Sequence, residues 1–364
     1  MHTASEEKYL SDKPSRKKPI FPVKEALREY LWKYGREVDL PASYEDLQRF
    51  TYTVPLKGKN GKDSSWERAT YDMREWEYLR DNLVKNYAIL KTKGDLEYVK
   101  HLDVAAIDFC YFGNSQPFRI RIINKFNANF DHYYIKQSDT SRIFGLELEH
   151  LLSPNRITYF TNKNTLVEEH IPGIPGDIFI NEYLNQPETN QIRLAKEFVK
   201  FNQRCFTQVL GDMRSYNFVV NITPDVLNYQ YRFRSIDFDQ QCYEGRKNLY
   251  LPHFFKENKP FVDIVSKHLN KESISQYQAE EKTLMAFRLA SARYRVKELL
   301  EIMSTEEISK PEKVLQLATE LADYYKQPSF LKAHTMGLIV KQQLKQELKS
   351  SLKHIPKTYS KIGD

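Results

Sequence analysis

The chain has 364 residues, of which 41% are hydrophobic and 28% are charged, and its formal net charge at pH 7 is +7. This length accommodates two or three domains with a substantial core, and no apolar run approaches the roughly 18 residues of a membrane-spanning helix. The first thirty residues are polar throughout, and the three cysteines, Cys110, Cys205 and Cys242, are far apart. We therefore expect no secretory signal, no membrane span, no disulfide framework and no zinc site. A reducing cytoplasm is the compartment that this composition favours.

The amino-terminal residues 1–20 are predicted to form a disordered basic arm that contains Arg16, Lys17 and Lys18. A basic arm is able to bind nucleic acid or an acidic surface. No basic motif interleaved with aromatic residues follows it, so a solvated tail is favoured and a nucleic-acid partner is not expected.

Residues 21–95 are predicted to form a helical amino-terminal module. The pattern VKEALREYLWKY, residues 23–34, is amphipathic at helical spacing, and LPASYEDLQRF begins like a second helix. A third helix is expected from about Ser65 to Leu90, after a loop rich in glycine and lysine. The sequence does not indicate what this module does.

The next part of the chain changes to short segments rich in β-branched and aromatic residues, separated by turn residues. The segment FRIRIIN alternates as a half-buried strand does. The expected order is three strands, one helix and two strands, over residues 104–112, 118–124, 132–137, 142–152, 156–160 and 164–171.

From Glu182 onward the chain is expected to be mostly helical. Two strands, residues 217–222 and 231–238, interrupt the helices, and residues 274–353 read as several amphipathic helices without a repeat of fixed period. Together with the first two segments, we expect domains over residues 96–170, 171–270 and 271–364.

One polar loop, GDMRSYN, carries an acid and an amide five residues apart, Asp212 and Asn217. By itself this spacing is more typical of a capped turn. The strand pair that follows returns to a second acid, Asp237, and the third expected strand ends with Lys136. Phosphoryl transfer uses hard oxygen ligands for Mg²⁺, a carboxylate that orients the acceptor hydroxyl, and a cation on the phosphates. These four side chains provide that set.

In this order the motifs resemble the protein-kinase-like superfamily, in the style of aminoglycoside phosphotransferases and choline kinases. The matching segments are YYIK, LVEEHIPGIPGDIF, GDMRSYN and SIDFD, and the resemblance extends from about Val104 to about Phe261. Each motif is weakly specific, and the specificity comes from their order and context. The resemblance implies an α+β, two-lobed kinase-like fold, with an antiparallel sheet in the small lobe, 96–170, and helices in the large lobe, flanked by the helical module and a helical tail.

The resemblance also implies residue roles. Asp212 would be the catalytic base, Asn217 and Asp237 would hold Mg²⁺, and Asp239 would assist at the metal. Lys136 would pair with the α- and β-phosphates of ATP. The remaining implied nucleotide contacts are the loop residues Gly113 and Ser115 and the hinge residues Glu169 and Ile171.

The acid that pairs with Lys136 should come from the following helix, which offers Glu147 and Glu149. Glu147 lies on the apolar stripe of that helix, and an acid on a buried face needs a cation or hydrogen-bond donors. Glu149 points about 200° away from it. We favour Glu147, and the residues leave Glu149 open.

Several positions depart from the kinase pattern. Gly113 is the only glycine of the first strand loop, Leu210 stands where antibiotic kinases have histidine, and Asp239 stands where protein kinases have glycine. Our expectation is therefore ATP- and Mg²⁺-dependent phosphotransfer to a hydroxyl of a small molecule. The alternative is a catalytically degenerate pseudokinase that binds nucleotide, or a protein partner through its helical modules. The sequence does not name the acceptor or the oligomeric state.

Overall fold

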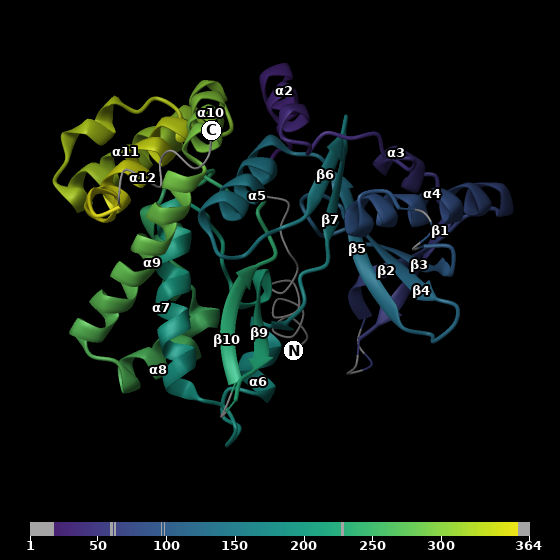
Figure 1. The fold of residues 1–364 in the computed structure, drawn as a ribbon, viewed down its shortest axis with the longest axis horizontal. Helices are drawn as coiled ribbons and strands as arrows, with labels where there is room; N and C mark the ends of the chain where they lie inside the picture. The colour runs from purple at the N-terminus through teal and green to yellow at the C-terminus, as the bar shows by residue number, and fades with distance from the viewer. Residues whose placement is uncertain are drawn as a thin grey trace, which may run out of the picture. The chain divides into compact units, whose positions relative to one another are not determined.

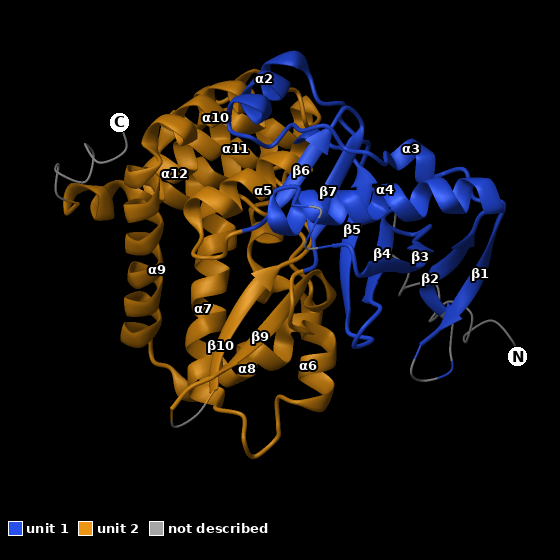
Figure 2. Ribbon diagram, turned by 45° about the vertical axis from the view of Figure 1, so that its right-hand side comes forward, with its two compact units in different colours: residues 1–140, 157–170 blue, residues 141–156, 171–364 orange. Residues whose placement is uncertain are grey.

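The computed structural model describes residues 18–355, apart from residues 59, 60, 62, 96, 98, 227 and 228. The chain divides into two compact units (Figure 2): residues 1–140 with 157–170, and residues 141–156 with 171–364. Most of the expected basic arm, residues 1–17, lies outside the described residues. Lys18 is buried, and its Nζ lies 2.5 Å from Asp139 Oδ2, so the prediction of a solvated arm was wrong at this residue.

The first unit is built on a seven-stranded antiparallel sheet with the order β1-β2-β3-β4-β5-β7-β6 (Figure 1). Its strands are β1 (Tyr52–Lys57), β2 (Asp63–Thr70), β3 (Leu102–Phe109), β4 (Phe118–Asn124), β5 (Phe130–Gln137), β6 (Tyr159–Asn162) and β7 (Thr165–Glu169). Its helices are α2 (Glu25–Lys33), α3 (Tyr44–Leu47) and α4 (Met73–Thr92).

The core of this unit lies between the sheet and helix α4. Alternate residues of β4 are buried, as the FRIRIIN pattern predicts, and β5 contributes Tyr133 and Ile135 from the same face. Leu79, Leu83 and Tyr87 of α4 belong to the same cluster of buried side chains. Because side chains alternate across a strand, the opposite face of β5 carries His132, Tyr134 and Lys136.

The expected helix from Ser65 to Leu90 is wrong in its first part. Residues 63–70 form strand β2, which pairs with β1 and, through Glu67 opposite Phe109, with β3. The helix begins only at Met73, where the Asp72 side chain accepts a hydrogen bond from the Glu75 backbone N–H. The amino-terminal segment is therefore not an all-helical module, since its hairpin extends the sheet of the first unit.

The second unit is mainly helical. Its α-helices are α5 (Thr140–Leu152, all but the first residue), α6 (Gly176–Glu182), α7 (Gln191–Gln208), α8 (Lys259–His268), α9 (Lys271–Ser291), α10 (Arg293–Thr305), α11 (Pro311–Tyr325) and α12 (Met336–Lys353). A three-stranded antiparallel sheet has the order β10-β9-β8, from β8 (Ile174–Pro175), β9 (Phe218–Pro224) and β10 (Tyr229–Ser235). Short 3₁₀ turns are η1 (Ser215–Asn217), η2 (Lys247–Tyr250), η3 (Pro252–Phe254), η4 (Lys256–Asn258) and η5 (Pro328–Lys332).

These elements confirm the expected strand pair after residue 216 and the expected helical carboxyl-terminal region. Five phenylalanine rings join α7, the β9–β10 hairpin and α8, with neighbouring centroids between 5.1 and 6.0 Å apart: Phe198, Phe201, Phe218, Phe233 and Phe261. Aromatic contacts of this kind add to the free energy gained from burying the rings. The hairpin is thereby held against α7, the helix that leads into the GDMRSYN loop. None of the helices in the described part of the chain is long and apolar enough to cross a membrane.

Candidate functional site

The GDMRSYN loop follows the carboxyl end of α7 and is held by backbone and side-chain contacts. The Asp212 N–H donates to the Leu249 carbonyl at 3.1 Å, and Asn258 Nδ2 donates to the Met213 carbonyl at 2.8 Å. A side chain at Gly211 would place its Cβ 3.2 Å from the ring of Tyr250. Asp212 itself has a φ of 56°, which is uncommon for a residue with a side chain. The loop conformation therefore depends on the segment that contains η2 to η4.

Within the loop, the Asn217 side chain is hydrogen-bonded to Asp212. Asn217 Nδ2 donates to the Asp212 carbonyl at 2.7 Å and lies 3.4 Å from Asp212 Oδ2. The structure thus brings together the acid and the amide that the sequence suggested as a pair. About one third of the Asp212 side chain is exposed, which leaves the carboxylate accessible from solvent.

Arg214 is a third member of this loop and was not among the site residues predicted from the sequence. Its Nε donates to Asp212 Oδ1 at 2.9 Å, and its Nη1 donates to Glu257 Oε1 at 2.6 Å. Burial alone would lower the pKa of the Arg214 guanidinium, but the hydrogen bond and the charge of Asp212 raise it. The Arg214 guanidinium therefore stays charged between the two acids Asp212 and Glu257. The signal was present as an arginine two residues after Asp212.

The hairpin places Asn217 beside Asp237. The β9–β10 ladder pairs Phe218 with Ser235, and one step further the Ile236 N–H donates to the Asn217 carbonyl at 3.0 Å. Asn217 therefore lies just before β9 and Asp237 just after β10, at the same end of the hairpin. The side chain of Asp237 is 33% exposed, and its Oδ1 accepts from the Asp239 backbone N–H at 3.0 Å.

Arg142, in the first turn of α5, binds both acids at the end of this hairpin. Its Nη2 donates to Asp237 Oδ1 at 3.1 Å, and its Nε lies 2.9 Å from Asp239 Oδ1. The guanidinium is 3% exposed and the Asp239 carboxylate 8% exposed, so this pair is held away from solvent. Arg142 was not predicted from the sequence either, because its partners lie almost a hundred positions further along the chain.

These contacts decide which expected ligands suit Mg²⁺. Asp237 and Asn217 offer oxygen atoms from neighbouring backbone positions, which fits one hard cation. Asp239 does not fit, because a buried guanidinium already neutralises its carboxylate. In the part of the chain that the structure describes, no three histidine, cysteine, aspartate or glutamate side chains form a group that could hold a metal.

Lys136 lies in the first unit, where its Nζ donates to Glu168 Oε2 on the neighbouring strand β7 at 2.7 Å. The two strands pair in a register that sets Lys136 opposite Leu166. Both charged groups are largely buried, with side chains 8% and 7% exposed. The expected partner Glu147 was wrong for this lysine.

Glu147 and Glu149 instead bind arginines of the second unit. Glu147 is fully buried and accepts two hydrogen bonds at 2.7 and 2.9 Å from Arg295 Nη2. Glu149 Oε1 accepts from Asn155 Nδ2 at 3.2 Å and lies 3.7 Å from Arg204 Nε. The argument that a buried acid needs a cation was sound, but the cation comes from α10.

The other expected nucleotide contacts lie in loops and at a strand end. Gly113 and Ser115 lie between β3 and β4, where the Gly113 carbonyl accepts from Gln116 and Ser115 is buried. Glu169 ends β7, and its N–H donates to the Thr158 carbonyl at 3.1 Å, so this donor is engaged within the sheet. Ile171 is buried in the second unit. Their nucleotide roles stay predictions.

Comparisons with known proteins add little to this description. No protein-family model and no curated protein matches the chain. One solved structure with a similarity, "Titin kinase and its flanking domains", has 12% sequence identity and a TM-score of 0.24. The match covers 73% of this chain and 51% of that one, so the chain spans about half of its length. A TM-score of this size does not carry a fold assignment.

Proposed function

We propose that the second unit carries a phosphotransferase site that moves the terminal phosphoryl group of ATP to a hydroxyl of a small molecule. The observation that supports it is the bonded set of Asp212, Arg214 and Asn217 beside the hairpin acid Asp237. The set provides an acid, a fixed cation and oxygen ligands within one loop and one hairpin end. These are the groups on which phosphoryl transfer depends.

In this proposal Asp212 acts on the acceptor. The hydroxyl oxygen forms a bond to the terminal phosphorus, the bond from that phosphorus to the bridging oxygen breaks, and the hydroxyl proton passes to Asp212. Arg214, which also binds Glu257, is placed to meet phosphate oxygens while it orients the Asp212 carboxylate. Asn217 and Asp237 would hold Mg²⁺, whose chemistry is to neutralise phosphate charge.

The acceptor class rests on the sequence differences. No A-P-E element follows Asp237, and Leu210 and Asp239 depart from protein-kinase and antibiotic-kinase patterns. We therefore propose a small molecule in place of a protein as acceptor. Lys136, which binds Glu168 within the first unit, stays a predicted phosphate contact.

The test compares Asp212→Asn and Asp212→Ala with the wild type. Hydrolysis or transfer from ATP is followed against a panel of alcohols, with Asp263→Asn as a control, because Asp263 is an exposed acid of α8. We expect the Asp212 variants to lose at least a hundredfold in turnover while the melting temperature still rises on adding ATP. Unchanged turnover in Asp212→Asn would rule out the role of Asp212.

A second candidate is a nucleotide-binding scaffold without catalysis. The observation that favours it is Arg142, whose guanidinium already binds Asp237 and Asp239. With the Arg142 guanidinium in the place of a metal ion, the site would bind ATP with little dependence on Mg²⁺. A melting titration with ATP, with and without Mg²⁺, separates the two candidates: a metal-independent shift without turnover favours the scaffold.

A further inference from the structure

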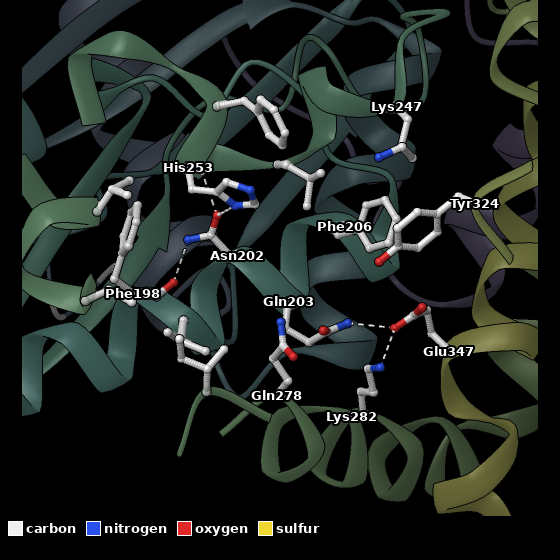
Figure 3. Close-up of a pocket in the computed structure, with 16 residues that line it drawn as sticks. Phe198, Asn202, Gln203, Phe206, Lys247, His253, Gln278, Lys282, Tyr324 and Glu347 are labelled. Atoms are coloured by element: carbon white, nitrogen blue, oxygen red, sulfur yellow. Dashed lines mark hydrogen bonds and ion pairs between the residues drawn. The ribbon is translucent and has the colours of Figure 1, made fainter. Parts of the chain in front are cut away.

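A cavity of about 480 Å³ lies in the second unit, on the side of α7 where α8 and α9 pack (Figure 3). Its volume is in the range of small-molecule binding sites. Its apolar wall comes from α7, α8, α9, α11 and the segment around η3, and includes Phe198, Phe206, Leu251, Val265, Ile274 and Tyr324. None of these residues belongs to the proposed phosphotransfer site.

Figure 3 shows several polar side chains at this cavity, among them the bonded pair Asn202 and His253. On one side Glu347 accepts a hydrogen bond at 2.8 Å from Gln203, and its carboxylate lies 2.8 Å from the ammonium of Lys282. The OH of Tyr325 also donates to Glu347. This acid is therefore neutralised by its own neighbours and leaves no excess negative charge on that side.

Lys247 enters from the other side, and its ammonium lies 4.6 Å from the centroid of the Tyr324 ring (Figure 3). Its hydrogen-bond partner is Asn248 Oδ1 at 3.3 Å, while Glu320 binds the backbone N–H of the lysine and not the ammonium. Among the described residues no carboxylate lies within ion-pair distance of this ammonium. An apolar cavity with a cation of this kind is complementary to an anion with an apolar body.

Lys247 belongs to the segment 247–258, which forms one wall of the cavity and also contacts the GDMRSYN loop. Leu251, His253 and Phe254 line the cavity, and between and beyond them the same segment contacts the loop. The Leu249 carbonyl accepts from Asp212, Asn258 donates to Met213, and Glu257 accepts from Arg214. Residues 247–258 therefore touch the cavity with some side chains and the candidate catalytic loop with others.

We propose that this cavity binds an amphipathic carboxylate, whose apolar body meets the phenylalanine and valine side chains and whose carboxylate meets Lys247. Its occupancy stabilises residues 247–258 and, through their hydrogen bonds, the conformation of the Asp212 loop. A ligand shifts the equilibrium between two conformations of this loop by the difference between its affinities for them. The binding step is independent of the proposed phosphotransfer, and only the regulatory step concerns the same loop.

Binding is tested with decanoate, by its displacement of the fluorescent anion 1-anilinonaphthalene-8-sulfonate, with decan-1-ol as the uncharged counterpart. We expect saturable binding of decanoate that weakens about tenfold in Lys247→Gln, which is the effect of one charged hydrogen bond. Lys267→Gln, an exposed lysine of α8 outside the cavity, should bind like the wild type. Val265→Phe should fill the cavity and reduce the binding of both compounds. Equal affinities in the wild type, Lys247→Gln and Val265→Phe would overturn the site.

The coupling is tested by hydrogen exchange of residues 211–217, without nucleotide or acceptor. Saturating decanoate should slow exchange in these residues in the wild type, and Val265→Phe should not respond. Unchanged exchange at saturation would refute the coupling. Asp212→Asn should bind decanoate like the wild type, so a failure of the phosphotransfer proposal is distinguished from a failure of this one.

Discussion

Replacing Arg142 by methionine tests the most consequential contact of the hairpin end. Methionine keeps the long apolar part of the side chain and removes the guanidinium. Asp239, whose carboxylate is 8% exposed and lies 2.9 Å from the guanidinium, then stays buried without that cation. Breaking a buried ion pair from one side costs about 3–5 kcal/mol. The pair with Asp237, which is one third exposed, adds at most about 1 kcal/mol.

The assay is urea unfolding at pH 7, followed by intrinsic fluorescence. We expect a loss of about 3–5 kcal/mol at pH 7, which lowers the urea midpoint by more than roughly 1 M. Arg142→Met combined with Asp239→Asn should recover part of it. A loss below about 1 kcal/mol at pH 7 would refute the reasoning.

The same variant shows whether Arg142 stands in for a metal ion. In Arg142→Met, millimolar Mg²⁺ should raise the urea midpoint, because the two acids would then bind the added cation. Arg204→Met is the matched control, since Arg204 is also buried and binds two acids, Glu149 and Glu281. That control should lose similar stability and should not respond to Mg²⁺. Equal responses in both variants would show a nonspecific effect of the ion.

Three further changes test other parts of the structure. Arg295→Leu should cost about 3–5 kcal/mol in urea unfolding at pH 7, because Glu147 is fully buried against that guanidinium; a neutral outcome would contradict the pair. Gly337→Ala would normally stabilise a helix, but its Cβ would lie 1.9 Å from the Met303 carbonyl oxygen, so the melting temperature should fall instead. Burial, with nearby arginine charges, lowers the pKa of His132 to about 4 from the usual value of 6.5. The neutral ring therefore contributes stability that is present above pH 6.5 and is lost toward pH 4. His132→Asn should make this acid loss smaller by about 1 kcal/mol, since the ring is only partly buried.

The strands and the GDMRSYN loop could be predicted because their causes are local. Alternation in FRIRIIN reports a half-buried strand directly, and the segment 118–124 coincides with β4. The error at residues 63–70 has a local explanation too. Trp66 and Tyr71 are large aromatic residues like those of the following helix. Asp72, with Glu75 three residues later, is a helix-start signal that places the boundary after the hairpin.

The ion pairs could not be predicted because they depend on tertiary packing. The buried face of α5 indicates that Glu147 needs a cation, but many lysines and arginines satisfy that requirement. Arg295 is separated from Glu147 by 148 positions in the chain. Its identity as the partner follows only from the fold of the second unit, which brings Arg295 of α10 to Glu147 of α5. The same holds for Arg142 and its two acids, which meet through the fold of the second unit.

The hairpin of β1 and β2, which extends the seven-stranded sheet of the first unit, also forms one edge of that sheet. Strand β1 is an edge, and Tyr52 and Val54 are exposed along it. An exposed edge of this kind invites pairing with another chain, which natural proteins prevent with proline, lysine and irregular register. Pro55 lacks a backbone donor, Lys57 adds a charge, and the register shifts between these two residues. At the opposite edge, the Val38 N–H donates to the Thr161 carbonyl of β6. The sheet is therefore protected at both edges against growing into an intermolecular β-structure during folding.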